Sequence, residues 1–520
     1  MFPTLLFDQD RIDPDRLRDQ TLRAARGLAA MGVREGDVVA IMLRNEPAAM
    51  QAILAARHLG AYWCGLNWHF KSGEARWLLE DSRASVLIVH ADLLPQIADG
   101  VPDGVQLLVV EPAPLTRKLY GLTDDAIALA LVSALTRSGH AEWSAWWRQH
   151  EPSAEAPRRP RGLMPYTSGT TGRPKGVKRV APATADVASR AADAERLGKV
   201  IFGVGADSIC LMSAPLYHSA PASYAAFCSQ MGATLRLEPK FDALRTLRFI
   251  EAERISHLYL VPTMYQRLLR LPDAVRAAHD TASVRFVAST GSACPAPVKQ
   301  AMIDWWGPVI NEAYASSETG YVTFIDSADW LTHRGSAGRV AGNATLRIVD
   351  AAGTTAPVGE IGTIYAIQRD YPDFEYANNP ASRRAVELDG LVTLGDMGYV
   401  DADGFLYVCD RNADMVISGG VNIYPAEIEA ELSVMPGIAD CAVFGIPDDE
   451  WGEALAAAVQ LRDGAVVSED QVRSYIAERM AGYKVPKVVA FHESLPREDS
   501  GKLFKRKLRA PYWERAGRSI

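Results

Sequence analysis

The segment Tyr166–Gly176, with the sequence YTSGTTGRPKG, constrains this chain more than any other. Its eleven residues include three glycines, four serine or threonine hydroxyls and one lysine, and no acidic side chain. Backbone N–H groups, hydroxyls and an ammonium can therefore approach a polyanion without a Cβ atom in the way. Pro174 precedes Lys175 where a Walker A loop requires glycine, so a P-loop is excluded. The segment predicts a phosphate-binding loop of another type, with a flexible surface turn as the plain alternative.

Size and charge disfavour a broad nucleic-acid-binding surface. The 520 residues are 48% hydrophobic and 23% charged, which is a globular composition, and the length indicates at least two domains. The formal net charge is −8, with 55 Lys and Arg against 63 Asp and Glu. Because no broad basic field is available for nucleic acid, an anionic ligand has to be held by a local site.

The cysteines and the apolar segments indicate a reduced, cytoplasmic protein. Six cysteines are scattered singly, which is typical of buried thiols and not of disulfides or a zinc site. The N-terminus turns acidic at once, so no signal peptide is expected. No apolar run reaches the ~18 residues of a transmembrane helix. A helix over Ala126–Leu135, together with Trp143, Trp146 and Trp147, could contact a membrane peripherally, although local core packing is the alternative.

The first part of the chain alternates between strand and helix patterns. Continuous apolar runs at Val38–Leu43, Ala61–Leu66 and Val86–Val89 are typical of strands that are buried on both faces. Helical patterns lie between them, and Asp13 and Pro14 open the first helix. This alternation predicts a layered α/β domain with mostly parallel strands.

A second unit is predicted near the C-terminus. Pro425 opens an amphipathic helix, two strand-like runs follow between residues 441 and 461, and Ser468 begins a capping box before another helix. These residues are numerous enough for a modest core of their own. We therefore expect an N-terminal domain over residues 1–409 and a small α+β domain over residues 410–520.

Six further segments follow the predicted phosphate-binding loop. They are Ala214–His218, Gly291–Pro295, Asn311–Glu318, Leu394–Asp396, Asp410–Glu429 and Pro496–Lys502. In this order the segments resemble the adenylate-forming superfamily, which includes acyl-CoA and aryl-CoA synthetases, peptide-synthetase adenylation domains and beetle luciferases. The resemblance covers nearly the whole chain. It implies a large N-terminal layered α/β domain and a small, mobile α+β C-terminal domain that carries a catalytic lysine.

The resemblance implies a binding site for ATP and AMP. Its predicted members are Thr167, Ser168, Gly169, Thr170, Thr171, Gly172, Lys175, Gly291, Ser292, Ala293, Tyr314, Ser317, Asp396 and Arg411. By resemblance, the loop that begins at Gly291 lies along the adenine, and Tyr314 stacks on it. Ser317, where the family has threonine, would contact the α-phosphate. Asp396 would accept hydrogen bonds from the ribose, and Arg411 would contact the ribose or a phosphate.

The catalytic roles also come from the resemblance, which assigns them to Lys502, Glu318 and His218. Glu318 would hold Mg²⁺, which prefers one or two carboxylates together with phosphate oxygens and water. His218 would lie beside the carboxylate of the substrate, although a hydrogen-bonded core histidine is the alternative. Lys502 would supply positive charge where charge develops in the adenylation step.

The acceptor and the acid are predicted from two other groups of residues. By resemblance, Gly419 and Gly420 border the tunnel for CoA, and Asp410 is the hinge of the small domain. The predicted acyl pocket consists of Ala222, Val261, Ser289, Ala315 and Tyr321. These side chains are mostly apolar or small, and none is the aspartate that the ammonium of an amino acid needs. They favour a fatty, aromatic or alicyclic acid.

The resemblance thus implies an ATP-dependent acyl-CoA synthetase whose partners are a carboxylic acid, ATP, Mg²⁺ and CoA, and which could form a homodimer. One alternative is an adenylating ligase that loads a carrier protein, and the segment Ser418–Pro425 disfavours it. Another is an inactive nucleotide- or acyl-binding regulator. The presence of Glu318, Asp396, Arg411 and Lys502 at the expected positions argues against that second alternative.

The segment Gly203–Ser208 imitates a dinucleotide-binding fingerprint after an apolar, strand-like run. Its last position is serine, and no acidic residue is placed to hold a ribose. We therefore do not expect a dinucleotide site there.

Overall fold

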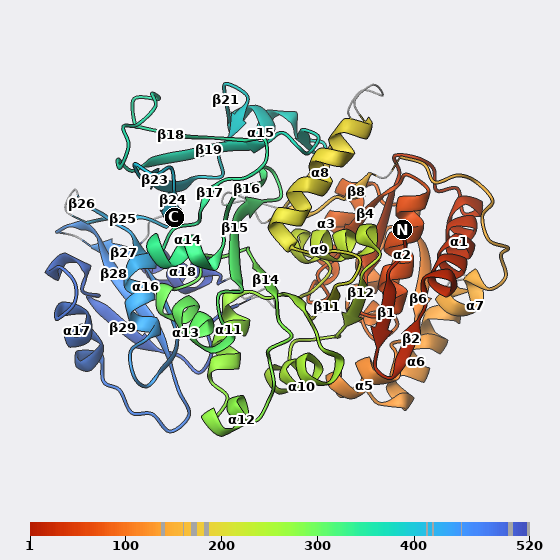
Figure 1. The fold of residues 1–520 in the computed structure, drawn as a ribbon, viewed down its shortest axis with the longest axis horizontal. Coiled ribbons are helices and arrows are strands. Elements are labelled where there is room, and N and C mark those ends of the chain that lie inside the picture. Colours follow the sequence, from red (N-terminus) through yellow and green to blue (C-terminus); the bar gives the residue numbers. More distant parts are fainter. Residues whose placement is uncertain are drawn as a thin grey trace.

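The computed structural model describes residues 1–136, 141–159, 161–167, 174–180, 187–411, 414–418, 421–448, 450–497 and 503–516. Two layered α/β sheets, a β-rich region and a small C-terminal unit follow one another along the chain (Figure 1). The predicted combination of a large layered α/β domain with a smaller α+β unit is confirmed.

The first sheet is parallel and comes from the N-terminal part of the chain. Its described strands run in the order β7-β6-β5-β3-β4-β8. They are β3 (Val38–Met42), β4 (Tyr62–Gly65), β5 (Val86–His90), β6 (Gln106–Val110), β7 (Ala141–Glu142) and β8 (Gly162–Leu163). Every residue of β3, β4 and β5 is buried, which explains the continuous apolar runs. Helix α1 (Pro14–Ala30) precedes β3, while α2 (Pro47–His58) and α3 (Ser72–Ser82) are crossover connections.

The second sheet carries most of the predicted site. Its described strands run in the order β17-β16-β15-β14-β13-β11-β12-β1-β2. They are β1 (Thr4–Phe7), β2 (Asp10–Ile12), β11 (Ile209–Met212), β12 (Thr234–Leu237), β13 (His257–Tyr259), β14 (Phe286–Ser289), β15 (Ile310–Ser316), β16 (Gly320–Ile325) and β17 (Arg339–Val340). From β1 to β15 in this order, neighbouring strands are parallel, so their carboxyl ends lie at one edge. Between β12 and β13 the chain crosses to the other side of β11, and open α/β sheets bind ligands at such a switch point.

The helices near this sheet correct one prediction. They include α8 (Val187–Phe202), α9 (Ser219–Met231), α11 (Pro262–Leu269) and α13 (Ala296–Trp306). The strand predicted before Gly203 is wrong, because these residues are the end of α8. Leu197, Ile201 and Phe202 are buried while Val200 is 46% exposed, which is the spacing of a helix with one buried face.

Two β-rich pieces join the phosphate-binding segment to later parts of the chain. The first has the order β20-β10-β9, with β9 (Tyr166–Thr167), β10 (Lys175–Arg179) and β20 (Phe374–Tyr376). The second contains β18 (Ala344–Val349), β19 (Gly362–Gln368), β21 (Glu387–Leu388), β22 (Leu391–Val392), β23 (Asp396–Val400) and β24 (Leu406–Arg411). Antiparallel pairing of β10 with β20 brings Val177 opposite Tyr376. A short strand far along the chain therefore lies beside the predicted phosphate-binding loop.

The C-terminal unit has its own sheet and core. Its elements are β25 (Val416–Ser418), β26 (Val421–Ile423), α16 (Pro425–Ser433), β27 (Ile438–Asp448), β28 (Gly452–Leu461), α17 (Glu469–Ala477), β29 (Val488–Phe491) and α18 (Lys505–Arg515). Pro425 is the first residue of α16, and Ser468 forms a capping box with Gln471 at α17, as the sequence predicts. Ile428 and Ile476 are fully buried in the core. The boundary predicted between residues 409 and 410 falls inside β24.

The aromatic cluster after α6 (Asp124–Thr136) packs inward. Trp143 and Trp147 are buried, and Nε1 of Trp143 donates a hydrogen bond to Oε1 of Gln51 at 3.0 Å. Leu129 and Val132 of α6 are exposed. All six cysteines are free thiols. Within the described ranges, no helix is both long and apolar enough to cross a membrane.

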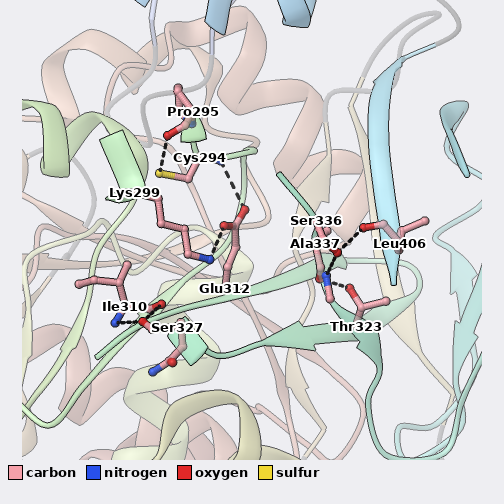
Figure 2. Close-up of polar contacts among 12 residues, drawn as sticks. Cys294, Pro295, Lys299, Ile310, Glu312, Thr323, Ser327, Ser336, Ala337 and Leu406 are labelled. Atoms are coloured by element: carbon pink, nitrogen blue, oxygen red, sulfur yellow. Dashed lines mark hydrogen bonds and ion pairs between the residues drawn. The ribbon is translucent and has the colours of Figure 1, made fainter. Parts of the chain in front are cut away.

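The glycine-rich turn Gly335–Gly338 connects β24 to β16 through hydrogen bonds. The carbonyl of Leu406 accepts hydrogen bonds from the hydroxyl of Ser336 and from the backbone N–H of Ala337, both at 2.8 Å (Figure 2). The hydroxyl of Thr323 on β16 donates to the carbonyl of Ala337 at 2.5 Å. Gly338 closes the turn, and its N–H donates to the hydroxyl of Ser336 at 2.9 Å. The turn therefore holds the strand that leads into the C-terminal unit.

We expect Gly338→Ala to destabilise the large domain strongly. The residue has φ +95°, and a Cβ atom there would lie 2.1 Å from the carbonyl oxygen of Phe324. Strain of this kind costs about 2–3 kcal/mol. Gly335→Ala is the matched control, since Gly335 also has positive φ (+84°) but open space around its Cβ position. Thermal unfolding followed by circular dichroism should show the larger loss for Gly338→Ala, and equal losses would contradict the clash.

Candidate functional site

His218 and most of the predicted acyl-pocket residues come from the carboxyl edge of the second sheet. His218 follows β11, Val261 follows β13, and Ser289 ends β14. Ala315 lies on β15 opposite Tyr321 of β16. Because β11, β13, β14 and β15 are parallel, these residues come to the same edge although they are far apart in the chain.

Most residues of the predicted acyl pocket are buried. Ala222, Val261, Ser289 and Tyr321 are buried, and Ala315 is half-buried. The ring of Tyr321 packs edge-to-face on that of Phe202 of α8, with centroids 5.4 Å apart. A wall of this composition receives an apolar chain or ring better than a charged group.

Asn45 fixes the backbone of the segment that leads to His218. Nδ2 of Asn45 donates to the carbonyl of Ala214 at 2.8 Å, and the backbone N–H of Leu216 donates to Oδ1 at 3.0 Å. Asn45 is fully buried after β3 of the first sheet. His218 itself is half-buried at the N-terminus of α9. The sequence analysis misses Asn45, whose only signal is an amide directly after a buried strand.

Glu318, the predicted metal ligand, is oriented by two hydroxyl groups. Oε1 of Glu318 accepts hydrogen bonds from Oγ1 of Thr167 at 3.0 Å and from the hydroxyl of Tyr376 at 3.1 Å. Glu318 is 3% exposed. Burial, and secondly the neighbouring Glu318, raises the pKa of Tyr376 far above its usual range, so the phenol remains a donor. Thr167 belongs to the predicted phosphate-binding loop, which the carboxylate thus joins to β20.

The donor set around Glu318 is compatible with a magnesium ion that a nucleotide would share. Oε1 of Glu318 accepts from two donors, so Oε2 is the oxygen that would be left for a cation. Among the residues that the structure describes, no group of three or more His, Cys, Asp or Glu could hold a metal by itself. Mg²⁺ commonly takes one carboxylate together with phosphate oxygens and water, which matches this donor set.

Arg179 and Lys175 of β10 lie beside the segment that carries Ser317 and Glu318 and beside Tyr376. Nη2 of Arg179 donates to the carbonyl of Ser317 at 2.5 Å, and Nη1 donates to the carbonyl of Pro372 at 3.1 Å. The hydroxyl of Ser317 donates to that of Ser219 at 3.0 Å. Nζ of Lys175 lies 5.1 Å from the centre of the Tyr376 ring. The strand that follows the predicted phosphate-binding loop is therefore tied to the Ser317 backbone, a role for Arg179 that the sequence analysis misses.

Tyr314 and Asp396, which are the predicted adenine and ribose contacts, lie on strands of two different sheets and form a hydrogen bond. The hydroxyl of Tyr314 on β15 donates to Oδ2 of Asp396 on β23 at 2.6 Å. Asp396 is buried and Tyr314 is half-buried. Gly291, Ser292 and Ala293, the predicted adenine loop, are exposed. A purine placed between that loop and Tyr314 would have its ribose near Asp396.

Comparison with known proteins decides the family. The sequence model of the AMP-binding enzyme family matches residues 3–369, and that of the AMP-binding enzyme C-terminal domain matches residues 427–502. The chain belongs to the AMP-binding enzyme family. The predicted resemblance to adenylate-forming acyl-CoA synthetases is confirmed.

Relatives of this AMP-binding enzyme include CoA ligases of two substrate types. A feruloyl-CoA synthase from Amycolatopsis is 33% identical over 95% of this chain and 92% of its own. A long-chain-fatty-acid–CoA ligase from Mycobacterium tuberculosis is 32% identical over 94% of this chain and 91% of its own. The crystal structure of an anthranilate CoA ligase in complex with anthranoyl-AMP has a TM-score of 0.83 at 25% identity, covering 99% of this chain and 95% of that one.

Several predicted site residues of the AMP-binding enzyme lie outside the described residues. They are Ser168, Gly169, Thr170, Thr171, Gly172, Gly419, Gly420 and Lys502. The described residues on either side of the last of these segments, 498–502, lie close together. Arg497 and Leu503 form an antiparallel bridge, and the N–H of Phe504 donates to the carbonyl of Pro496 at 2.9 Å, so the segment that carries Lys502 begins and ends at the same place.

Asp410, the predicted hinge of the AMP-binding enzyme, contacts the C-terminal unit. Its Oδ2 accepts a hydrogen bond from the backbone N–H of Ala426, in the first turn of α16, at 3.0 Å. A carboxylate is favourable at a helix N-terminus, where N–H groups lack partners inside the helix. Asp410 also pairs with Met397 of β23, so it contacts both the β-rich region and the C-terminal unit.

We expect Tyr376→Phe to lower the rate of pyrophosphate release from ATP about tenfold, because a hydrogen bond to a charged carboxylate is lost. Since Thr167 still donates to Glu318, the effect should be smaller than that of removing the carboxylate. The measurement is pyrophosphate release as a function of Mg²⁺ concentration. A midpoint unchanged from wild type would show that Tyr376 does not orient Glu318.

Proposed function

We propose that this AMP-binding enzyme activates an apolar carboxylic acid with ATP and then transfers the acyl group to CoA. The observation that carries the proposal is the meeting of Thr167, Tyr376 and Glu318 beside the hydrogen-bonded pair of Tyr314 and Asp396. This arrangement offers a place for the phosphates next to a place for the nucleoside. The acid would then lie at the adjoining edge of the second sheet.

In the first step, a carboxylate oxygen of the acid attacks the α-phosphorus of ATP. The new P–O bond gives the acyl-adenylate, and the bond to the β-phosphate breaks to release pyrophosphate. Two anions have to approach one another, so the site must supply positive charge and donors. Lys175 and the predicted phosphate-binding loop would hold the leaving group, His218 would lie beside the carboxylate, and Lys502 would contact the developing charge.

Magnesium, when bound, would neutralise part of the phosphate charge. Glu318 is the residue that would hold it, with Thr167 and Tyr376 keeping the carboxylate in one orientation. The hydroxyl of Ser317 would contact the α-phosphate, and Arg179 fixes the backbone of Ser317.

In the second step, the sulfur of CoA attacks the acyl carbonyl, the thioester bond forms, and AMP leaves. We propose that CoA passes Gly419 and Gly420 and that the small domain, over residues 410–520, turns about Asp410 between the two steps. Rotation of a domain about a few residues is a common way to present different groups to one site.

The buried, mostly apolar residues of the predicted pocket support an aromatic, fatty or alicyclic acid. Both curated relatives described above act, by their names, on acids with large apolar parts. We also expect the enzyme to work in the cytoplasm, where its six free thiols would stay reduced. A homodimer and peripheral membrane contact through the exposed face of α6 remain part of the proposal, to be tested by light scattering and vesicle sedimentation.

The test is pyrophosphate release from ATP with a panel of acids, followed by AMP release after CoA is added. The panel should include a phenylpropenoic acid, an indole acid, a medium-chain and a long-chain fatty acid, and an amino acid as the negative control. Turnover with an apolar acid and CoA-dependent AMP release are expected. Pyrophosphate release without use of CoA would favour a carrier protein as acceptor, and no release with any acid would favour an inactive binding protein.

A further inference from the structure

Two charged residues that the proposed mechanism does not use lie at the base of the predicted adenine loop (Figure 2). Lys299 on α13 is fully buried, and Glu312 on β15 is nearly so. Nζ of Lys299 lies 3.1 Å from Oε2 of Glu312. The other carboxylate oxygen, Oε1, accepts a hydrogen bond from the backbone N–H of Cys294 at 3.3 Å.

Stability alone does not explain an ion pair at this position. Taking two charges out of water costs so much that apolar residues of similar volume often serve a core equally well or better. What apolar residues cannot supply is an acceptor for the N–H of Cys294, a buried residue whose backbone group needs a partner. Lys299 lies 5.1 Å from the centre of the Trp330 ring, and its ammonium keeps the carboxylate in place.

The predicted adenine slot is the gap between the loop Gly291–Ala293 and the ring of Tyr314. Glu312 contacts the residue next to the first side of this gap and shares a strand with the second. Alternate residues of a strand point to the same face, so Glu312 and Tyr314 share one face of β15. Cys294 directly follows Gly291–Ala293, which is the first side of the gap. Those three residues are exposed, and the Cβ position of Gly291 meets no atom within 4 Å. The contact between Glu312 and Cys294 is therefore where this loop is fastened to the strand that presents Tyr314.

We propose that Glu312, held by Lys299, is a positioning residue that sets the gap between the loop Gly291–Ala293 and the ring of Tyr314, and thereby the affinity for AMP and ATP. The inference rests on the proposed function, which places the adenine in that gap. Glu312 acts through the backbone of Cys294 and not by touching the nucleotide.

Two double variants separate the acceptor from the charge. Lys299→Met with Glu312→Gln removes both charges and keeps an oxygen that can accept from Cys294. Lys299→Met with Glu312→Leu removes the same charges and leaves that N–H without an acceptor. We expect the leucine variant to bind AMP about tenfold more weakly than the glutamine variant in isothermal titration calorimetry. The KM for ATP should differ in the same direction, while the KM for the acid should agree between the two.

Asp304→Asn is the control for helix α13, because Asp304 is exposed on the same helix. It should leave AMP affinity as in the wild type. Equal AMP affinities of the two double variants would overturn the inference. So would parallel losses of AMP and acid binding in the leucine variant, because a general structural defect weakens both.

The same measurements distinguish this inference from the proposed function. A wild-type protein that binds AMP but releases no pyrophosphate with any acid would overturn the proposed function, while the comparison of the double variants would still decide the role of Glu312. A wild-type protein that binds neither ATP nor AMP would overturn both.

Discussion

Replacing Lys502 with alanine should slow formation of the acyl-adenylate by about 10²–10³-fold, which is the usual cost of removing one donor to a developing negative charge. The second step should keep most of its rate, because CoA attacks an adenylate that is already formed. Single-turnover measurement of each step checks this, with pyrophosphate release for the first step and thioester formation from supplied acyl-adenylate for the second.

Arg506→Ala is a suitable control for Lys502→Ala. Arg506 is exposed on α18, in the same basic C-terminal region, and is given no role in the proposed mechanism. Its loss should leave both steps unchanged. If Lys502→Ala slowed both steps equally, the lysine would act on folding or on domain position and not on the attack at phosphorus.

Replacing Glu318 with glutamine should lower kcat/KM of adenylation about 100-fold at low Mg²⁺, because metal-ion stabilisation of phosphoryl charge contributes several kcal/mol. Glutamine keeps the shape of the side chain and an oxygen that can accept from Thr167 and Tyr376, so the local fold should persist. The decisive measurement is the Mg²⁺ dependence of pyrophosphate release, which should shift to much higher concentration.

Glu375→Gln provides the matched control for Glu318→Gln. Glu375 precedes Tyr376 on β20, is exposed, and points to the opposite face of the strand. It should leave the Mg²⁺ dependence unchanged. An unchanged Mg²⁺ dependence of Glu318→Gln itself would show that another residue holds the metal.

The regular parts of the fold could be predicted because their sequence patterns are local. The buried strands β3 and β5 appear as continuous apolar runs, and Pro425 opens its helix where expected. The prediction of a strand before Gly203 is wrong because three apolar residues in a row fit a strand and a helix end equally well. The exposure of Val200 and the burial of Leu197, one turn before Ile201, identify the helix.

The candidate site could be predicted as motifs but not as a network of contacts. Thr167 and Glu318 come from recognisable segments, whereas Asn45, Arg179 and Tyr376 come from none of them. Tyr376 lies on a strand of three residues, and its partner Glu318 is 58 positions away. No local pattern encodes such a contact, because pairing of β10 with β20 creates it.

The pairing at the end of β24 connects the proposed hinge to the predicted ribose contact. Asp396 pairs with Arg411, and Met397 pairs with Asp410, on adjoining rungs of one β-ladder. If Asp396 holds the ribose and the small domain turns about Asp410, ligand occupancy and domain orientation change the same few backbone pairs. The two equilibria are then coupled, and the coupling is reciprocal: the factor by which a nucleotide shifts the orientation is the factor by which orientation shifts nucleotide affinity. The nucleotide is then an effector of domain position as well as a reactant.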